Sequence, residues 1–250
     1  MSMFEKNKMK GADFHRREFL KKGAALASVT LASGVTLMAL SQGAAASANP
    51  NIRWGLLIDA NKCPSDCNAC ISACSNEHGW EDTGLDTDPQ WIRKVTLKNK
   101  NTGRETSLPL MCQHCEKPPC VDVCPTGASF KRADGIVLVD RHICIGCRYC
   151  MMACPFKARS FVHEKIEGQK TSSPRGKGTV EGCNMCVHKL DAGEGTTACT
   201  QACETSGNGA MIFGDLNDAN SEISLALANY PSVELRDDLR LNLGVRYKNI

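Results

Sequence analysis

Aromatic side chains are scarce in this chain of 250 residues, which has three Trp, three Tyr and seven Phe. Glycine is abundant, with 21 residues. Large side chains supply most of the area that a core buries, so this composition argues against one large conventional apolar core. Something other than hydrophobic packing must therefore help to hold the fold together.

A strong excess of one charge is also missing once the N-terminus is set aside. The formal net charge is +3, but the first 48 residues hold seven Lys or Arg against three Asp or Glu. The rest of the chain is nearly neutral and has no basic stripe. This excludes the electrostatic footprint of a protein that binds nucleic acid or an anionic membrane surface, and it favours protein partners.

Long apolar runs are absent after residue 48, where no segment reaches the roughly 18 residues that a membrane-spanning helix needs. Before it, a basic segment (residues 14–22) is followed by a mildly apolar stretch (residues 23–40) and by small residues up to Ala48. This order predicts an export signal, residues 1–48, that is cleaved after Ala48. The pair Arg16 and Arg17 resembles a twin-arginine signal, which predicts a periplasmic protein.

The alternative interpretation of the N-terminus is an uncleaved membrane anchor, because no charged residue occurs between residues 23 and 52. That stretch is rich in Ala, Gly, Ser and Thr rather than in Leu, Ile and Phe, so we favour cleavage. Twin-arginine export carries folded proteins with their cofactors already inserted. An oxidising compartment favours disulfides, whereas this export route favours metal.

Cysteine is the abundant component, with 16 residues that all occur at or after Cys63. They form four groups of four with none left over. The groups are Cys63, Cys67, Cys70, Cys74; Cys112, Cys115, Cys120, Cys124; Cys144, Cys147, Cys150, Cys154; and Cys183, Cys186, Cys199, Cys203.

The third group, in CIGCRYCMMACP, matches the bacterial ferredoxin spacing C-x2-C-x2-C-x3-C-P at every position. In that pattern three close thiolates wrap one cluster, and the fourth cysteine is carried to a neighbouring cluster. The second group has a longer gap that contains two prolines, the first has x3 where x2 is usual, and the fourth has a twelve-residue excursion. Despite these departures each group still has four cysteines, so the sequence predicts four [4Fe-4S] clusters.

Two alternatives compete with iron–sulfur ligation for these cysteines. A disulfide scaffold would suit an exported chain of this cysteine density, and two CxxC pairs can make a tetrahedral zinc site. Neither a disulfide scaffold nor a zinc site needs compact runs of three cysteines plus one. Iron–sulfur ligation is therefore favoured over both.

An internal repeat predicts an α+β fold of two bacterial-ferredoxin-like units, the inner inserted into the outer. Residues 128–140 read as a β-hairpin around Asp134-Gly135, and residues 158–161 occupy the place after the third group that residues 128–130 occupy after the second. Strand candidates at 54–59 and 210–214 flank the outer groups. The expected parts are 49–110 (outer unit, with an insertion at 80–108), 111–164 (inner unit), 165–182 (linker), 183–215 (outer unit) and 216–250 (C-terminal extension).

The ferredoxin rule then predicts how the groups exchange their fourth cysteine. By that analogy, Cys112, Cys115 and Cys120 take Cys154, and Cys144, Cys147 and Cys150 take Cys124. In the outer unit, Cys63, Cys67 and Cys70 take Cys203, and Cys183, Cys186 and Cys199 take Cys74.

Four blocks carry a wider resemblance: RWGLLIDANKC, LPLMCQHCEKPPCVDVCPTGA, DGIVLVDRHICIGCRYCMMACPF and GAMIFGDLNDANSEI. They resemble the four-cluster electron-transfer subunits that accompany molybdenum reductases, certain hydrogenases and quinone-interacting membrane complexes. The signal and the C-x3-C opening are most similar to the DsrO group, the periplasmic iron–sulfur subunits of Dsr membrane complexes in sulfur metabolism. The last residues, LNLGVRYKNI, depart from the resemblance.

The resemblance implies a polytopic quinone-binding membrane protein and a multihaem cytochrome c as partners, in a respiratory or sulfur-metabolism complex. The alternative is the electron-transfer subunit of a molybdopterin oxidoreductase of tetrathionate or polysulfide type, or of a periplasmic hydrogenase. Nitrate reductase relatives have Trp where this chain has Cys147, at a three-iron cluster that faces the membrane subunit. The resemblance thus implies that the inner unit lies nearest the membrane partner.

Catalysis has little support in the sequence. None of the six histidines stands in a CxxCH or HExxH setting, and they are expected to be surface residues or cluster neighbours: His15, His78, His114, His142, His163 and His188. Basic residues near the cysteines are interpreted as solvated charge in preference to tuning or docking groups: Lys117, Arg132, Arg141, Arg148 and Arg159. A site in which Cys fills every protein-ligand position offers a substrate no place on iron, so electron transfer is predicted. Purely structural clusters remain the third class.

Overall fold

The computed structural model describes residues 30–32, 35–36 and 48–250. The chain divides into two compact units, Met1–Ala46 and Ser47–Ile250. In the first unit, β1 (Thr30–Ala32) pairs with β2 (Val35–Thr36) in antiparallel fashion. The rest of the predicted signal, apart from Ala48, lies outside the described residues. Among the residues described, no helix has the length and apolar character required to cross a membrane.

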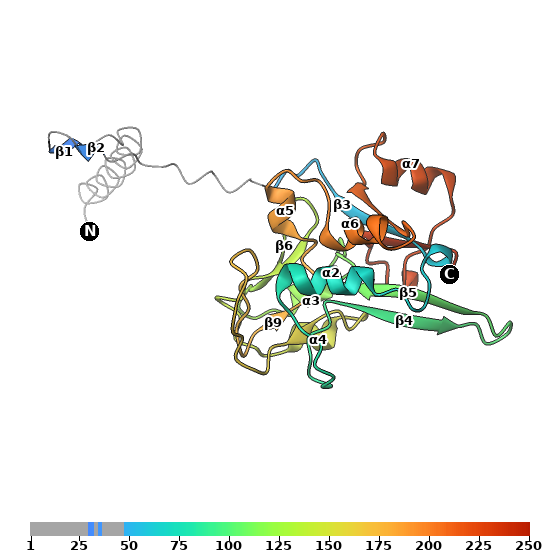
Figure 1. The fold of residues 1–250 in the computed structure, drawn as a ribbon, viewed down its shortest axis with the longest axis horizontal. Helices are drawn as coiled ribbons and strands as arrows, with labels where there is room; N and C mark the ends of the chain where they lie inside the picture. The colour runs from blue at the N-terminus through green and yellow to red at the C-terminus, as the bar shows by residue number, and fades with distance from the viewer. Residues whose placement is uncertain (1–29, 33–34, 37–47) are drawn as a thin grey trace, which may run out of the picture. The chain divides into compact units, whose positions relative to one another are not determined.

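A three-stranded sheet in the order β10-β3-β11 forms the centre of the second unit (Figure 1). Strand β3 (Trp54–Asp59) pairs antiparallel with β10 (Met211–Asp215), so the two strands predicted to flank the outer cysteine groups do meet. Strand β11 (Val245–Lys248) adds to the other edge in parallel. The middle of β3 is apolar without alternation, which suits a central strand that is covered on both faces.

The segment expected to be a C-terminal extension, residues 216–250, contains a strand that the sequence did not predict. Val245 and Tyr247 are fully buried in β11, and the Tyr247 hydroxyl donates to the Pro109 carbonyl oxygen at 3.2 Å. Between β10 and β11 lie α7 (Glu222–Asn229), whose N-cap Ser221 accepts from the Ser224 N–H, and the 3-10 helix η2 (Asp237–Leu239). The C-terminal segment is therefore part of the central sheet.

Helices that carry cysteines lie beside this sheet. Helix α2 (Ala69–His78) follows the 3-10 helix η1 (Ala60–Lys62) and ends at Gly79, which adopts the left-handed conformation common at helix C-termini. Helix α6 (Ala198–Thr205) begins after Thr197, whose side chain accepts from the Thr200 N–H. Residues of α2 and α6 contact each other, and α5 (Val187–Asp191) precedes α6.

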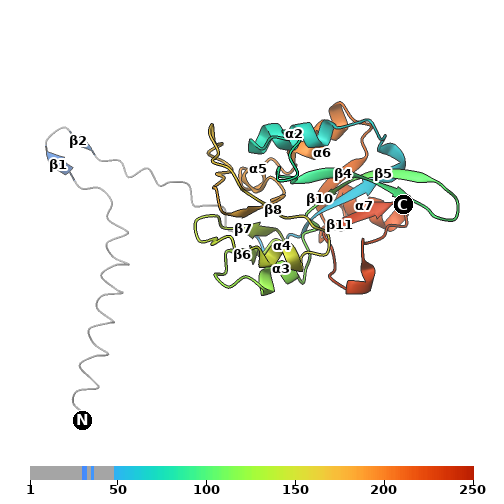
Figure 2. The ribbon, with the colours of Figure 1, turned by 90° about the horizontal axis from the view of Figure 1, so that it is seen from below.

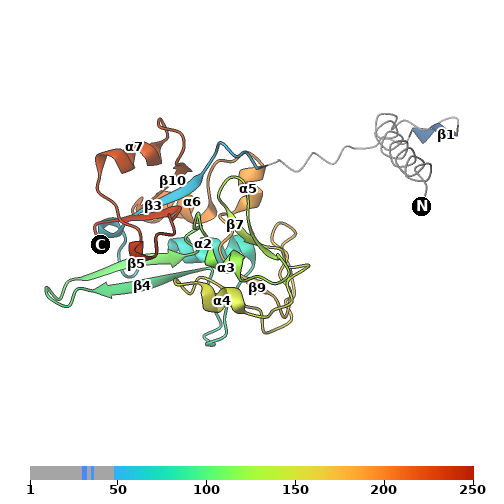
Figure 3. The same cartoon turned by 180° about the vertical axis from the view of Figure 1, so that it is seen from behind.

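The predicted insertion at 80–108 contains regular structure that the sequence did not predict. Strand β4 (Ile92–Lys98) and β5 (Glu105–Met111) form an antiparallel hairpin with an unbroken seven-residue register. Its tip extends to the edge of the unit, as Figures 1 and 3 show. Its base is buried, because Trp91, Leu108 and Met111 are almost fully covered.

The inner cysteine groups lie on short elements that Figure 2 shows close together. Strands β6 (Ser129–Lys131) and β7 (Val137–Val139) form the predicted hairpin, with Gly135 at a φ of 85° in the turn. Helices α3 (Pro119–Asp122) and α4 (Tyr149–Ala153) contact each other.

Part of the expected linker 165–182 belongs to a second hairpin. Strand β8 (Ser160–Phe161) pairs with β9 (Val180–Glu181), which lies in that linker. A buried ion pair between Arg175 and Glu181 fixes the segment, with Arg175 also donating to the Gly79 carbonyl oxygen at 2.7 Å. The end of the linker is therefore anchored to the body of the unit.

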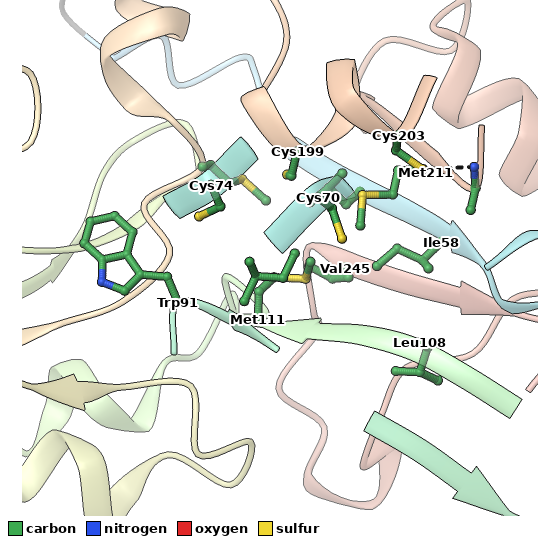
Figure 4. Packing of buried hydrophobic residues seen from close by; sticks show 14 of the residues in the cluster. Ile58, Cys70, Cys74, Trp91, Leu108, Met111, Cys199, Cys203, Met211 and Val245 are labelled. Atoms are coloured by element: carbon green, nitrogen blue, oxygen red, sulfur yellow. Dashed lines mark hydrogen bonds between the residues drawn. The ribbon is translucent and has the colours of Figure 1, made fainter. Parts of the chain in front are cut away.

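Cysteines and apolar side chains share the largest buried cluster, which Figure 4 shows in part. It joins Ile58 of β3, Met211 of β10, Val245 of β11 and Met111 of β5 to four cysteines of α2 and α6. The thiols thus occupy places that aliphatic side chains would fill in an ordinary core, as the scarcity of aromatics implied.

Candidate metal centres

All sixteen cysteines are free thiols, so the structure contains no disulfide among them. Each group uses the same local device: its third cysteine is the second residue of a helix, and its fourth follows four residues later. The third cysteines are Cys70, Cys120, Cys150 and Cys199, in α2, α3, α4 and α6. Residues four apart lie one helical turn along the same face, so one helix can direct two thiols to two neighbouring sites.

A second device shapes the loops between the first two cysteines. In the second, third and fourth groups the residue before the second cysteine has a positive φ: His114 (44°), Gly146 (68°) and Met185 (53°). Non-glycine residues rarely adopt this conformation. It curls each CxxC loop tightly. The first group has x3 at this place, and its intervening residues 64–66 show no positive φ.

Three of the four predicted cysteine sets each line one small pocket. We name each site after its first close-run cysteine. The three are the Cys63 site (Cys63, Cys67, Cys70, Cys203), the Cys112 site (Cys112, Cys115, Cys120, Cys154) and the Cys144 site (Cys124, Cys144, Cys147, Cys150).

The fourth predicted set is named the Cys183 site (Cys74, Cys183, Cys186, Cys199), and several of its thiols influence one another's acidity. The pKa of Cys183 is raised well above its ordinary value by burial first, and then by the thiolates of Cys74 and Cys199. The pKa of Cys74 is raised by burial, with Cys199 and Cys186 adding to it. In Figure 4, Cys74 and Cys199 lie close together between α2 and α6.

Burial raises the pKa of many of these thiols, to about 12 for Cys70, Cys112 and Cys186. A buried thiolate is costly without a cation, so these groups stay protonated until metal binds and displaces the protons. Four thiols converging without nearby carboxylate ligands suit iron–sulfur clusters, whose protein ligands are thiolates.

The geometry also separates a cluster from a single metal ion. Among the residues that the structure describes, no group of three His, Cys, Asp or Glu side chains converges on a point that would hold one ion. Zinc–sulfur bonds are about 2.3 Å long, so four thiolates on zinc leave no void between them. The three cavities instead provide space among the sulfurs, which fits a polynuclear group.

Backbone N–H groups donate to several sulfurs. The Ser129 N–H lies 3.3 Å from Cys124 Sγ, and the Ala210 N–H lies 3.2 Å from Cys203 Sγ. Val180 and Ala198 donate similarly to Cys144 and Cys186, each at 3.5 Å. These donors come from strands or from residues that adjoin helices and strands, so the secondary structure fixes their direction.

Side-chain donors also reach the thiols. Trp80 Nε1 lies 3.4 Å from Cys74 Sγ, His78 Nε2 lies 3.4 Å from Cys186 Sγ, and Thr197 Oγ1 lies 3.2 Å from Cys199 Sγ. Sequence reasoning did not identify Trp80, which lies outside the first group, or Thr197, which lies inside the fourth group but at no position that the ferredoxin spacing marks. His78 is a cluster neighbour, as expected, and burial lowers its pKa to about 4, so it is neutral at pH 7.

Arg159 corrects the interpretation of the nearby basic residues as solvated charge. It is only 7% exposed, and its Nη2 donates to Cys120 Sγ at 3.2 Å and to Ser129 Oγ at 3.0 Å. Burial by itself lowers the pKa of Arg159, but the thiolates of Cys120, Cys112 and Cys150 outweigh burial and raise it. The side chain therefore remains a cation.

The other four basic residues named from the sequence have varied roles. Lys117 is exposed, as expected of a solvated charge, and Arg132 pairs with Asp134 and Asp191. Arg141 lies over the Trp91 ring at 5.2 Å, and Arg148 over the Phe161 ring at 3.8 Å. None of these four donates to a thiol within the described part of the chain.

The histidines do not gather into a catalytic group in the described structure. His114 is fully buried, accepts from the Val137 N–H at 3.0 Å, and has a pKa lowered to about 3 by burial. His188 pairs with Glu77, while His142 and His163 lie nearer the surface. His15 lies outside the described residues.

Comparison with known proteins identifies the type of site. A family profile described as a 4Fe-4S dicluster domain matches residues 105–216. This stretch contains three complete cysteine groups, so the predicted [4Fe-4S] cofactor type is confirmed. The match begins at β5 and ends just after β10.

Relatives extend the likeness over almost the whole chain. The chain is 38% identical to the Hdr-like menaquinol oxidoreductase iron-sulfur subunit 1 of Archaeoglobus fulgidus, over 94% of this chain and 98% of that protein. It is 34% identical to protein NrfC of Escherichia coli, over 93% and 92% respectively. It is 37% identical to a tetrathionate reductase subunit of Salmonella typhimurium, over 72% of this chain and 64% of that protein.

Proposed function

Because the chain belongs to the family of ferredoxin-type [4Fe-4S] electron-transfer subunits, we propose that it relays single electrons through four clusters between two partner proteins. The main supporting observation is that three predicted cysteine sets each line one small pocket with all four of their thiols. The fourth set shares the same arrangement of helix and loop. We assign one [4Fe-4S] cluster to each of the four sites.

The clusters supply the one-electron carriers, and the protein residues set their surroundings. Four thiolates complete the protein ligands at each site, so no residue there is left to bind or activate a substrate. Burial in the core excludes water, while backbone and side-chain N–H groups donate to the sulfurs. Both effects determine the reduction potential of each cluster.

A nested fold accounts for the pairing of the cysteines. We propose that β6 to β9 with α3 and α4 form an inner ferredoxin-like unit around the Cys112 and Cys144 sites. The sheet β10-β3-β11 with α2 and α6 would form the outer unit around the other two. The contact of α3 with α4, and of α2 with α6, supports this division.

The exposed end of the relay supports a membrane partner at the Cys144 site. Cys147 is the one exposed cysteine of the sixteen, all of which the structure describes. Apolar side chains around it are exposed too, including Ile145 and Met152 at 67% and 68%. We propose that a polytopic quinone-binding subunit covers this surface. The name of the Archaeoglobus relative, a subunit of a menaquinol oxidoreductase, is consistent with it.

The other end of the relay would face a soluble partner. Cys63 and Cys67 are partly exposed, which places the Cys63 site near the surface of the outer unit. We propose a multihaem cytochrome c or a molybdopterin catalytic subunit there, the second being favoured by the likeness to the tetrathionate reductase subunit. A periplasmic hydrogenase remains an alternative partner.

Location follows from the N-terminal sequence. We propose that residues 1–48 direct export by the twin-arginine route and that the protein then lies in the periplasm, attached to the membrane through its partners. Export of the folded, metal-loaded protein would keep the buried thiols from oxidation.

Metal analysis of anaerobically purified protein tests the cluster count. Four clusters predict about sixteen iron and sixteen inorganic sulfide per chain. A mediated redox titration should then show reversible one-electron steps, which clusters of purely structural role need not show. A reproducible iron content near eight, or zinc in place of iron, would contradict the proposal.

A further inference from the structure

Arg159 occupies a place that sets it apart from the other arginines. It lines the cavity of the Cys112 site and donates to the sulfur of Cys120. Its second terminal nitrogen, Nη1, is buried and has no hydrogen-bond partner among the described residues. A group that fills the cavity would therefore meet a buried donor.

No carboxylate balances this charge within the part of the chain that the structure describes. The similarly buried Arg175 pairs with Glu181, and Arg132 pairs with Asp134 and Asp191, whereas Arg159 has no ion pair. Its hydrogen-bond acceptors are a thiol and the Ser129 hydroxyl. A buried cation acts through a low effective dielectric, so its field on the site is stronger than that of a solvated arginine.

The internal repeat allows Arg159 to be compared with the residue at the same position in the other half of the repeat. In Cys154-Pro-Phe-Lys-Ala-Arg159 and Cys124-Pro-Thr-Gly-Ala-Ser129, the residue five positions after the fourth cysteine is a cation in one half and a neutral serine in the other. Both preceding alanines are 1% exposed, so the two positions are equivalent in packing. Arg159 and Ser129 also contact each other across the repeat. The charge therefore breaks the symmetry of two otherwise similar sites.

We propose that Arg159 raises the reduction potential of the cluster in the Cys112 site above that of the cluster in the Cys144 site. Reduction adds one negative charge to a cluster. A fixed cation and a hydrogen bond to a ligand sulfur both stabilise the reduced form more than the oxidised form. The Cys144 site also lies in the field of Arg159 through Cys150, but its hydrogen bonds come from the neutral Ser129 and Val180 N–H groups and it therefore receives less of this stabilisation. This inference rests on the proposed cluster ligation, and Arg159 acts on potential without binding a substrate.

Two substitutions separate charge from packing. Arg159→Met keeps most of the side-chain volume and removes the charge, whereas Arg159→Lys keeps the charge and loses the planar fork. EPR-monitored redox titration of the loaded protein should show one cluster shifted to lower potential in the Met variant. We expect about a tenfold change in its one-electron equilibrium, equal to 59 mV. The Lys variant should shift by less than half as much.

Arg93→Met is the matched control. Arg93 donates to the carbonyl oxygens of Phe156 and Lys157, at 2.9 and 2.8 Å, and so anchors the loop that carries Arg159 without touching a thiol. If Arg159 only held this loop in place, both Met variants would shift the potentials alike. We expect the control to leave all four potentials within threefold of the parent equilibrium.

The iron content and the reduction potentials test the cluster assignment and the role of Arg159 separately. Iron content is measured first, so a parent protein without about sixteen iron refutes the cluster assignment and not this inference. With clusters present, unchanged potentials in Arg159→Met, or a uniform shift of all four, overturn the role of Arg159. If the Met variant fails to load its clusters, the Lys variant decides. A tenfold change in the one-electron equilibrium of the Lys variant would overturn a role of the charge, and a change below threefold would support that role.

Discussion

At the scale of single residues, the loops between cysteines impose backbone conformations that few side chains tolerate. Gly146, between Cys144 and Cys147, has a φ of 68°, and a Cβ there would clash with the Gly178 carbonyl oxygen. The CIGC loop and the loop before β9 can thus approach closely only because Gly146 lacks a side chain. The first of these loops carries two of the proposed ligands of the Cys144 site.

Gly146→Ala should therefore destabilise the protein and weaken one cluster. The left-handed conformation costs an alanine roughly 1 kcal/mol, and the clash adds about 1–3 kcal/mol. Thermal unfolding of the loaded protein should show the lower stability, and iron content should fall by about a quarter as the Cys144 site fails to fill.

Gly127→Ala is the control for this change. Gly127 has a φ of 70° and also lies just after a ligand, Cys124, but nothing stands within 4 Å of where its Cβ would be. Only the conformational cost of about 1 kcal/mol should appear, with iron content unchanged. Equal effects of the two alanines would show that the close approach to Gly178 is unimportant.

At the scale of elements, helices α2 and α6 each carry cysteines of two different proposed sites. Helix α6 directs Cys199 to the Cys183 site and Cys203 to the Cys63 site, one turn apart. The same device recurs in α2 with Cys70 and Cys74. The helix is thus a rigid link that fixes the separation of two clusters.

Changing two cysteines of α6 one at a time tests this link. Cys203→Ser should alter the EPR signal of the cluster in the Cys63 site, and Cys199→Ser that of the cluster in the Cys183 site, while both leave the inner two signals intact. Serine replaces a strong thiolate ligand with a weaker one and hardly changes the volume. If both variants alter the same cluster, or if either removes an inner signal, the nested pairing is wrong.

Elements with local signals were predictable, and those that depend on distant partners were not. The hairpin β6–β7 was found because Asp134-Gly135 is a turn signal between two apolar runs, and the meeting of β3 with β10 followed from the order of the cysteine groups. Strand β11 pairs with a strand almost 190 residues earlier, and nothing nearby in the sequence announces it. The hairpin β4–β5 was missed because its apolar residues do not alternate regularly.

In the candidate sites, too, the features with a local sequence signal were predictable and those that depend on distant residues were not. The cysteines could be grouped from spacing alone, because each group is contiguous or nearly so, whereas their pairing is a prediction that rests on analogy with ferredoxins. The groups that donate hydrogen bonds to the cysteine sulfurs could not be predicted from the sequence, because they lie far away along the chain. Arg159 and Cys120 are 39 residues apart, and His78 and Cys186 are 108 residues apart. Burial of Arg159 depends on packing between the two halves of the repeat, which no charge pattern reveals.

At the scale of the whole molecule, the sites differ in exposure, and this suggests a direction for the relay. The Cys183 site has three fully buried cysteines, whereas the Cys144 site includes exposed Cys147 and a surround of exposed apolar side chains. Electron transfer requires short distances between carriers. An exposed cluster is best placed to exchange electrons with a partner, so we propose the membrane subunit at the Cys144 site.

Cys147→Trp tests both the ligand and the orientation. Removing one of four thiolates leaves Cys124, Cys144 and Cys150, a set suited to a three-iron cluster, and the exposed position accommodates the larger side chain with little cost to packing. The oxidised variant should show a new three-iron EPR signal. In the native membrane complex, electron exchange with quinone should slow more than exchange with the soluble partner. Without a three-iron signal, Cys147 is not a ligand; with the signal but unchanged quinone exchange, the membrane partner lies at another site.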